Sequence, residues 1–523
     1  MLFEVEDSLI TGDILGERAR ITPDSVALIE VRTGREFTYR QLDERATACA
    51  RGWIDRCGLR AKERVGILAE NRVEFIEAFC AAGKSGIILV PLSTRNTAHE
   101  LAHIVSDSGM RCLMYSSQYE ATVEELRSLA PVDTYIRLDT TAYTSSDCSR
   151  VEGANAGSIP LRQEITPEDI YCLLYTSGTT GRPKGVMIPH RQIAWNAYNT
   201  VISWQLRDND SMQIFTPLYH AGGLAVCLTP LFAIGGRIIL HDGFDAAEVL
   251  RVFDEYRCSI IFGVPTIFKL LMEAPEFAAV DFGHARWCIS GGAPLPRYII
   301  TAYQERGVTF KQGYGLTEVG VNCFAMTASD SVRKPGSIGN PMMFTQAKLV
   351  GGDGKGLEAN EVGELCLRGP HVSLGYWNNE AATAEVLDAD GWFHTGDLAQ
   401  RDEEGFFYIA GRLKEMIISG GVNVYPAEIE AELLQHEAIK DAAVIGIADE
   451  KWGEVPIAFL VLQAGSALTG EEINEFLAKK LSKIKLPRRF EFMEALPRNA
   501  YGKALKNELR SLVSARSPSA GLR

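Results

Sequence analysis

The sequence lacks paired cysteines, long apolar runs and an excess of positive charge. Its 11 cysteines are scattered singly, without a C-x-x-C pair, which argues against a disulfide framework or zinc site and indicates a reducing compartment. The longest apolar run, residues 224–236, contains Pro230 and is too short to cross a bilayer. The acidic N-terminus has no signal-peptide pattern. We therefore expect a cytoplasmic protein without a transmembrane segment.

Acidic side chains outnumber basic ones, 67 to 53, which gives a net charge of −14. This balance argues against a nucleic-acid partner. Residues 479–510 are the exception, because they contain ten basic and three acidic side chains. This basic stretch suits a phosphate group or, through weak contact, an anionic membrane surface. A solvated basic face without a partner is the alternative.

The pattern of apolar residues predicts an α/β fold in a large N-terminal domain. Helical patterns alternate with short apolar strands such as residues 64–68, 86–90 and 259–262, which is typical of parallel sheets covered by helices. The length predicts roughly three to four folding units of about 150 residues each. Residues 141–160, rich in Ser, Thr, Gly and Ala, are expected to form a surface loop.

The pattern changes near residue 410, where a smaller α+β domain is predicted. A strand at 406–409 ends at Gly411, and Pro426 opens a helix. Strands at 442–447 and 457–462 and helices at 471–481 and 504–512 follow, within the usual size of a domain. We predict a domain of residues 1–410, a hinge at 411–415, and a mobile domain of residues 416–523.

One loop is rich in groups that bind phosphate. A short apolar strand at 170–175 leads into a segment with the hydroxyl, glycine and lysine residues Thr176, Ser177, Gly178, Thr179, Thr180 and Lys184. Glycines let the backbone approach a bulky anion, while hydroxyls, amides and a lysine offer donors and charge. Gly185 follows the lysine, so the segment is not a P-loop. Gly83-Lys84-Ser85 has a P-loop ending, but Ala78 replaces its first glycine, which predicts a helix-to-strand turn.

A second glycine turn, at residues 312–318, presents an aromatic ring, a hydroxyl and a carboxylate in succession. Tyr314 suits stacking on a purine, Thr317 can donate to a phosphate, and Glu318 can bind Mg²⁺. The alternative is a plain glycine turn with a solvated glutamate, because short glycine patterns occur often.

Three further segments carry isolated polar groups. Asp397 follows a glycine turn and suits a pair of vicinal hydroxyls, although a turn aspartate that caps its own backbone is the alternative. The segment from Gly411 combines two cations with a glycine pair, namely Arg412, Lys414, Gly420 and Gly421. Its alternative is a charged linker before a helix. Lys503 follows a proline turn near the C-terminus, where a solvated lysine is the alternative.

Together these segments resemble the adenylate-forming superfamily of acyl-CoA ligases, adenylation domains and firefly-type luciferases. The resemblance covers residues 10–512 and is nearest to bacterial fatty-acyl-CoA ligases, through residues 290–294, 416–421 and 451–454. It implies a reaction in two steps. A carboxylate attacks the α-phosphate of ATP to form an acyl-adenylate and pyrophosphate, and coenzyme A then displaces AMP. ATP, Mg²⁺ and CoA are the implied cofactors.

The resemblance also implies roles for single residues. Thr176 to Thr180 and Lys184 would hold the β- and γ-phosphates, and Gly292, Ala293, Gly313 and Tyr314 would surround adenine. Thr317 would contact the α-phosphate, Glu318 would bind Mg²⁺, and Asp397 and Arg412 would hold the ribose. Lys503 would bridge the acyl carboxylate and the α-phosphate. Lys414 would be the hinge, Gly420 and Gly421 would line the thiol tunnel, and the basic stretch would meet the CoA 3′-phosphate.

Tyr219 and His220 bear on the choice of acid. Relatives that activate amino acids have aspartate where this sequence has His220, which argues against an α-amino acid. Acyl- and aryl-CoA ligases carry an aromatic–histidine pair here, which implies a gate for the thiol tunnel and a wall of the acyl pocket. A core histidine satisfied by backbone groups is the alternative. The glycines at 291, 313, 315 and 320 leave space beside the acyl carbonyl.

The presumed pocket segments contain no cation for a second carboxylate. We therefore expect an apolar monocarboxylic acid, with a fatty acid favoured and an aryl acid as the alternative. A ligase that loads a carrier protein, a luciferase-like monooxygenase and a non-catalytic binding protein are further alternatives. The sequence does not indicate whether the protein is a monomer or a homodimer.

Overall fold

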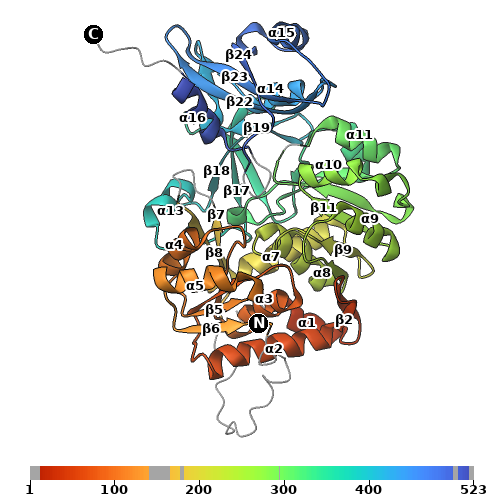
Figure 1. The fold of residues 1–523 in the computed structure, drawn as a ribbon, viewed down its shortest axis with the longest axis vertical. Coiled ribbons are helices and arrows are strands. Elements are labelled where there is room, and N and C mark those ends of the chain that lie inside the picture. Colours follow the sequence, from red (N-terminus) through yellow and green to blue (C-terminus); the bar gives the residue numbers. More distant parts are fainter. Residues whose placement is uncertain (1–11, 140–164, 177–181, 294, 499–503, 517–523) are drawn as a thin grey trace, which may run out of the picture.

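Two mostly parallel sheets form the greater part of the molecule in a computed structural model, which describes residues 12–139, 165–176, 182–293, 295–498 and 504–516 (Figure 1). The six-stranded sheet has the order β6 (Thr134–Arg137), β5 (Cys112–Tyr115), β3 (Arg64–Leu68), β4 (Ile88–Pro91), β7 (Ile170–Thr176), β8 (Lys184–Pro189). The seven-stranded sheet has the order β13 (Phe310–Gln312), β12 (Trp287–Ser290), β11 (Ile260–Gly263), β9 (Ser211–Ile214), β10 (Arg237–Leu240), β1 (Val26–Glu30), β2 (Arg35–Thr38). Strands β2 and β8 pair antiparallel with their neighbours, and the predicted parallel sheets are confirmed.

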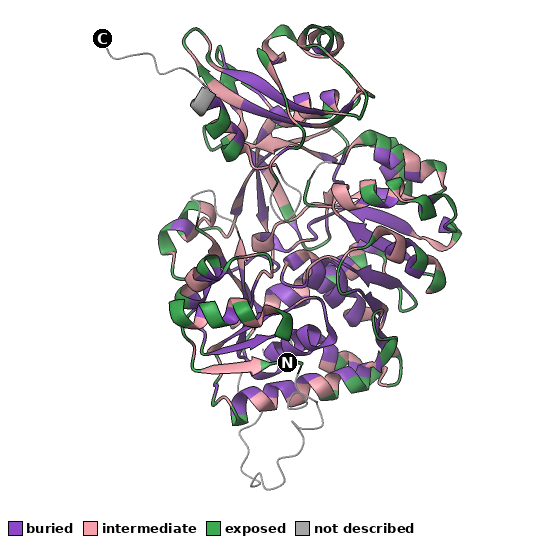
Figure 2. Ribbon diagram, in the orientation of Figure 1, coloured by how far each residue is buried: buried purple, intermediate pink, exposed green. Residues whose placement is uncertain are grey.

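Helices cover both sheets, and one apolar core joins them. The helices of the large domain are α1 (Ile14–Ile21), α2 (Tyr39–Asp55), α3 (Val73–Ser85), α4 (Ala98–Ser108), α5 (Glu120–Leu129), α7 (His190–Trp204), α8 (Thr229–Ile234), α9 (Ala246–Glu255), α10 (Pro265–Glu273), α11 (Arg297–Glu305), α12 (Ala328–Arg333) and α13 (Glu380–Val386). Every residue of α3 is buried. The core it belongs to includes Ile67 from one sheet and Met212 from the other. The outer helices instead combine exposed and buried residues (Figure 2), as surface helices do.

A third sheet, which the sequence pattern did not predict, follows the two parallel ones. Strands β16 (Gln346–Val350), β17 (Val362–Arg368), β18 (Phe393–Arg401) and β19 (Phe407–Arg412) pair antiparallel throughout. Strands β14 (Phe324–Ala325) and β15 (Asn340–Pro341) form a short antiparallel pair, and a bridge between Gly339 and Phe407 connects it to this sheet. The Asp402 carboxylate accepts from the amides of Glu404 and Phe406 and closes a tight turn, which permits antiparallel pairing without a crossover helix.

The C-terminal domain has its own sheet and its own core. Its elements are β20 (Ile417–Ser419), β21 (Val422–Val424), α14 (Pro426–Leu433), β22 (Ile439–Asp449), β23 (Gly453–Leu462), α15 (Gly470–Ala478), β24 (Arg489–Phe492) and α16 (Lys506–Arg516). Pro426 begins α14, as predicted. Apolar clusters lie on both faces of the sheet. The α/β class with a large N-terminal and a small C-terminal α+β domain is therefore confirmed (Figure 1).

The described cysteines and helices bear on two expectations from the sequence, namely that the protein has no disulfide framework and no transmembrane segment. Nine of the ten cysteines that the structure describes are buried, and none of these ten forms a disulfide. Within the described ranges, no helix combines the length and the hydropathy that a bilayer crossing requires. The loop expected at residues 141–160 lies outside the described residues.

The segment Gly83-Lys84-Ser85 ends α3, as the sequence predicted, and carries a buried ion pair. The Lys84 Nζ lies 3.1 Å from the Asp13 carboxylate and also contacts Asp43. Only 8% of the Lys84 side chain is exposed. A buried lysine between two carboxylates holds the helix end against the N-terminal segment and is not available to bind phosphate.

We expect Lys84→Met to lower the free energy of unfolding by about 3 kcal/mol, because the variant leaves buried carboxylates without their cation. Urea denaturation measures the change. Lys62→Met is the matched control, since it breaks the pair of the exposed Lys62 with Asp169, 2.9 Å away, and should cost less than about 1 kcal/mol. Equal losses in the two variants would contradict a buried ion pair at Lys84.

Candidate functional site

The carboxyl ends of three parallel strands meet at one edge of the seven-stranded sheet, where α/β folds bind ligands. Strands β11, β12 and β13 are neighbours. Gly291, Gly292 and Ala293 follow β12, and Gly313 and Tyr314 follow β13. The Gly313 amide donates to the Ser290 carbonyl (2.7 Å). This bond holds the two predicted adenine segments side by side.

Tyr314, Asp397 and Arg412 meet although they come from three different parts of the chain. The Tyr314 hydroxyl donates to Asp397 Oδ2 (2.6 Å), and Arg412 Nε lies 2.6 Å from Asp397 Oδ1. Asp397 and Arg412 are also direct partners across β18 and β19. Burial and the nearby Asp397 charge raise the pKa of Tyr314. The predicted adenine and ribose residues therefore form one connected group.

Glu318 and Lys184 meet at Tyr376, which was not among the residues predicted from the sequence. The Tyr376 hydroxyl donates to Glu318 Oε1 (3.0 Å), and Lys184 Nζ lies 4.9 Å from the centre of the same ring. That distance permits a cation–π contact. A tyrosine between two glycine-rich motifs, after Gly375, was the available signal in the sequence.

The surroundings of Glu318 suit a divalent cation. Burial raises the pKa of Glu318, although hydrogen bonds and the charge of Arg412 oppose that rise. A cation beside the carboxylate would relieve the burial penalty. Mg²⁺ needs only one or two protein carboxylates when phosphate oxygens and water complete its shell, so a single glutamate is a sufficient protein ligand.

The predicted phosphate segment connects two paired strands. Thr176 ends β7, Lys184 begins β8, and the two residues are partners in the ladder. Ser177, Gly178, Thr179 and Thr180 lie outside the described residues, so their contacts with phosphate stay a prediction. The strands nevertheless anchor both ends of this segment beside Tyr376, because Val186 of β8 forms an isolated bridge with Tyr376.

The Tyr219–His220 pair lies on the loop after β9 of the seven-stranded sheet. Hydrogen bonds with Asn71, in the loop after β3 of the six-stranded sheet, hold this loop in place. The two rings are 4.7 Å apart. Asn71, which precedes α3, accepts from the Leu218 amide (2.8 Å) and donates to the Thr216 carbonyl (3.0 Å). Burial and the positive charge of Arg95 lower the pKa of His220 to about 3. His220 is therefore neutral at physiological pH.

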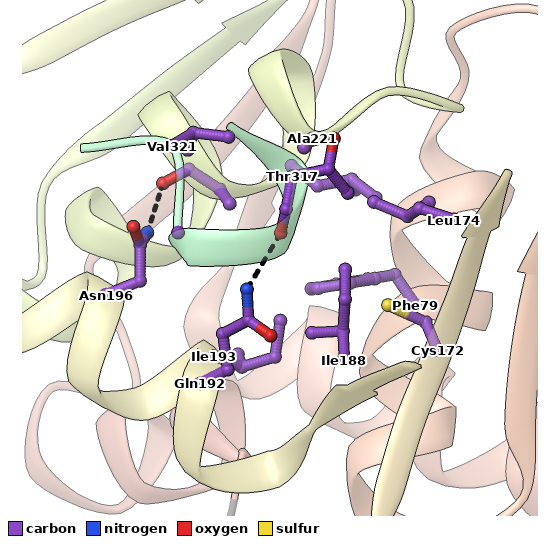
Figure 3. A pocket seen from close by; sticks show the side chains of 13 residues that line it. Phe79, Cys172, Leu174, Ile188, Gln192, Ile193, Asn196, Ala221, Thr317 and Val321 are labelled. Carbon is purple, nitrogen blue, oxygen red and sulfur yellow. Dashed lines mark hydrogen bonds between the residues drawn. The ribbon is translucent and has the colours of Figure 1, made fainter. Parts of the chain in front are cut away.

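A small apolar cavity lies beside Thr317 and Ala221, which directly follows His220 (Figure 3). Its volume is about 20 Å³, and its lining includes Phe79, Ile188, Leu224, Thr317 and Gly320. Gln192 and Asn196 of α7 supply polar groups, and the Gln192 amide donates to the Thr317 carbonyl (2.9 Å). A π-helix, Gly222–Leu228, forms one wall, and such segments occur often at functional sites.

The glycines predicted to give space to the acid differ in their surroundings. A Cβ on Gly315 would collide with the backbone oxygens of Val321 and Gly320, so this glycine lets two backbone segments pack together. Gly320 has a φ of +73° and lies against Asn196 and His371, in a conformation that favours glycine. Among the described residues, a Cβ on Gly291 would meet Phe262 and Gly313 at ordinary contact distance.

The structure describes three of the predicted residues of the C-terminal part, Lys414, Gly420 and Gly421, which lie in two turns. Lys414 is exposed, in the 3-10 turn Leu413–Glu415 that joins β19 to β20. Gly420 and Gly421 form the β20–β21 turn, where the Gly420 amide donates to the Trp452 carbonyl (2.7 Å). Among the described residues, neither Glu318 nor Lys184 forms a hydrogen bond or ion pair with this turn. Lys503 lies outside the described residues.

Many charges of the basic stretch at residues 479–510 are neutralised within the C-terminal domain. Among the nine of its basic side chains that the structure describes, those that form ion pairs with carboxylates include Lys480, Lys485, Arg489, Arg498 and Lys506. The excess of positive charge available to a phosphate group or a membrane is therefore smaller than the sequence indicates.

Comparison with known proteins identifies the same two-part organisation. A family model described as AMP-binding enzyme matches residues 15–377, and one described as AMP-binding enzyme C-terminal domain matches residues 428–503. A feruloyl-CoA synthase from Amycolatopsis sp is 36% identical over 94% of this chain and 97% of its own. The long-chain-fatty-acid–CoA ligase FadD13 from Mycobacterium tuberculosis is 36% identical over 97% of this chain and 99% of its own.

The solved structure of ATP-bound MatB from Rhodopseudomonas palustris superposes with a TM-score of 0.87 at 29% identity, covering 96% of this chain and 99% of MatB. The apo form of the same protein, with the same identity and coverage, gives a TM-score of 0.77. The overall arrangement is therefore closer to the ATP-bound form. From the matched models and these full-length similarities, the chain belongs to the AMP-binding enzyme family.

Proposed function

We propose that the protein is an ATP-dependent ligase that activates an apolar monocarboxylic acid as its adenylate and transfers the acyl group to coenzyme A. One observation carries this proposal: the strand-end glycines, the Tyr314–Asp397–Arg412 group and the Lys184–Tyr376–Glu318 group surround one edge of the sheet. The first group suits a nucleoside and the second suits a polyphosphate with its metal. Curated relatives of nearly equal length are CoA ligases.

The arrangement supports a division of tasks in the first step. Tyr314, Asp397 and Arg412 hold the nucleoside, and Lys184 with the segment after Thr176 holds the leaving pyrophosphate. Glu318 is the metal ligand, and Mg²⁺ bound there would neutralise charge on the phosphates. Lys503 brings the acid carboxylate and the α-phosphate together against their repulsion, which is large in a dry site.

The second step requires a different set of groups. We propose that the C-terminal domain turns about Lys414 and brings the Gly420–Gly421 turn to the thiol. A domain that exchanges catalytic groups also excludes water from the labile acyl-adenylate between the steps. The separate core of this domain and its short connection through Leu413–Glu415 support such a rotation.

The cavity beside Thr317 is too small to hold an acid, because about 20 Å³ holds little more than one water. The absence of a cation from its lining nevertheless supports an acid without a second charge near this point. The lining residues are apolar apart from Gln192, Asn196 and Thr317, and none is a cation. We propose a fatty acid as the substrate. An aryl acid is the second candidate, favoured by the 36% identity with a feruloyl-CoA synthase.

The decisive experiment measures pyrophosphate release and CoA-ester formation with a panel of acids. The panel comprises saturated fatty acids of increasing length, aryl acids including ferulate, dicarboxylates and α-amino acids, each with and without CoA. We expect fatty acids to release pyrophosphate and to form the thioester only with CoA. A preference for ferulate would select the aryl alternative. No release of pyrophosphate with any acid would contradict the proposal.

Lys503→Ala should lower pyrophosphate release at least about 10²-fold, the usual effect of removing one group that stabilises transition-state charge. Thioester formation from a supplied acyl-adenylate should change much less, and this second half-reaction serves as the internal control. Near-normal pyrophosphate release by the variant would rule out the assigned role of Lys503.

Tyr376→Phe should raise the Mg²⁺ concentration for half-maximal pyrophosphate release about tenfold, because it removes a hydrogen bond to a carboxylate worth about 1.5 kcal/mol. Burial raises the pKa of Glu318 and the Tyr376 bond opposes the rise, so its loss favours the protonated form. The defect should therefore be larger at pH 6 than at pH 8.

Tyr115→Phe is the matched control for this prediction, since Tyr115 also donates to a glutamate, Glu120, at 3.0 Å. It should leave the Mg²⁺ dependence unchanged. An unchanged Mg²⁺ dependence in Tyr376→Phe would disprove the coupling between Tyr376 and the metal ligand.

A further inference from the structure

Lys506, the first residue of α16, joins the connecting turn to the body of the C-terminal domain. Its Nζ lies 2.8 Å from Glu415 of the turn and 2.9 Å from Glu430 of α14. Only 12% of the Lys506 side chain is exposed. Burial opposes the charged form, but the carboxylates of Glu430 and Glu415 outweigh it and raise the pKa of Lys506. The lysine is therefore charged between two carboxylates.

Glu430 is itself fixed to the sheet of the C-terminal domain. Its Oε1 accepts a hydrogen bond from the Val444 amide of β22 (2.7 Å). Through Lys506, the end of the connecting turn is thus tied to α16, α14 and β22 together. A buried charge that pairs with two carboxylates, one of which is itself fixed by a backbone amide, has few alternative positions.

On the other side of the turn, Arg412 is tied to the large domain. It pairs with Asp397, which is 4% exposed, and stands opposite it in the β18–β19 ladder. The Arg412–Asp397 and Lys506–Glu415 pairs leave Leu413 and Lys414 between them. A rotation of one domain against the other that keeps both ion pairs must change the backbone at these two residues.

Helix α14 provides an internal comparison. Three of its glutamates each pair with a lysine of the same domain, because Glu428 pairs with Lys485 (2.7 Å) and Glu432 with Lys480 (2.9 Å). Of the three lysines that pair with these glutamates, Lys506 is the one that also pairs with the connecting turn, through Glu415. Lys506 is therefore the one of these three lysines whose loss would affect the connection between the domains. Lys480 and Lys485 serve as comparisons with the same kind of ion pair.

We propose that Lys506 is a positioning residue, which holds Glu415 so that the domain rotation is confined to Leu413 and Lys414. The inference rests on the proposed function, since it requires two half-reactions with two domain orientations. Without Lys506, the carboxylates of Glu415 and Glu430 repel each other, and Glu415 loses the cation that ties it to α14 and α16. The domain then spends less time in either productive orientation, so both half-reactions slow.

The test measures the two half-reactions separately in Lys506→Met, Glu415→Gln and Lys506→Arg. We expect the first two variants to lower kcat about tenfold in pyrophosphate release and in thioester formation from supplied acyl-adenylate, because misplaced catalytic groups slow chemistry steeply. KM for ATP and for the acid should change less than kcat, since the large domain supplies every proposed contact to them apart from those of Arg412 and Lys503. Lys506→Arg keeps the charge and should restore most of the rate.

Glu432→Gln is the matched control, because it breaks an ion pair of the same helix that has no contact with the turn, and it should leave both rates unchanged. Thermal melting shows whether each variant is folded. If Lys506→Met does not fold, Glu415→Gln decides, since it keeps the side-chain volume. Rates in Glu415→Gln equal to those in Glu432→Gln would overturn the inference. Absence of pyrophosphate release by the unaltered protein would instead overturn the proposed function.

Discussion

The buried carboxylate of Asp397 constrains the arrangement of the whole site. A charge that is 4% exposed must find donors and a counter-charge, or its burial becomes costly. The donor is the Tyr314 hydroxyl, from the end of the seven-stranded sheet, and the counter-charge is Arg412, from the last strand before the C-terminal domain. Satisfying this one group therefore aligns the parallel sheet, the antiparallel sheet and the connection between domains.

The sequence was sufficient for those parts of the fold that follow a local pattern. Strand β3 occupies residues 64–68 as predicted, and Pro426 begins α14. The sequence also showed that Gly83-Lys84-Ser85 is not a phosphate-binding P-loop, because a P-loop has a glycine at the position of Ala78. Family membership was predicted from motifs in the correct order, although each motif alone had a plain alternative. Such agreement between local signals and the global fold is what natural sequences are expected to have.

Other features depend on contacts between distant residues and left weak local signals. The antiparallel sheet at residues 346–412 pairs strands across connections of very different length, from the turn at 402–406 to the segment 369–392 that contains α13, and apolar periodicity does not reveal this pairing. Tyr376 becomes part of the site through its contacts with Glu318 and Lys184, which are 58 and 192 residues away in the sequence. Lys506 resembled any other lysine of a basic stretch until Glu415 and Glu430 surrounded it. The sequence likewise does not reveal that Gly315 serves backbone packing.

The two ion pairs that flank Leu413 and Lys414 also bear on how such chains diversify. Asp397 and Arg412 both precede this dipeptide, whereas Glu415, Glu430 and Lys506 all follow it. A recombination event that joins two related genes between these residues keeps every member of both pairs with its original partner. The dipeptide is therefore a tolerant junction, where a lineage can acquire a different C-terminal module without rebuilding the charges on either side.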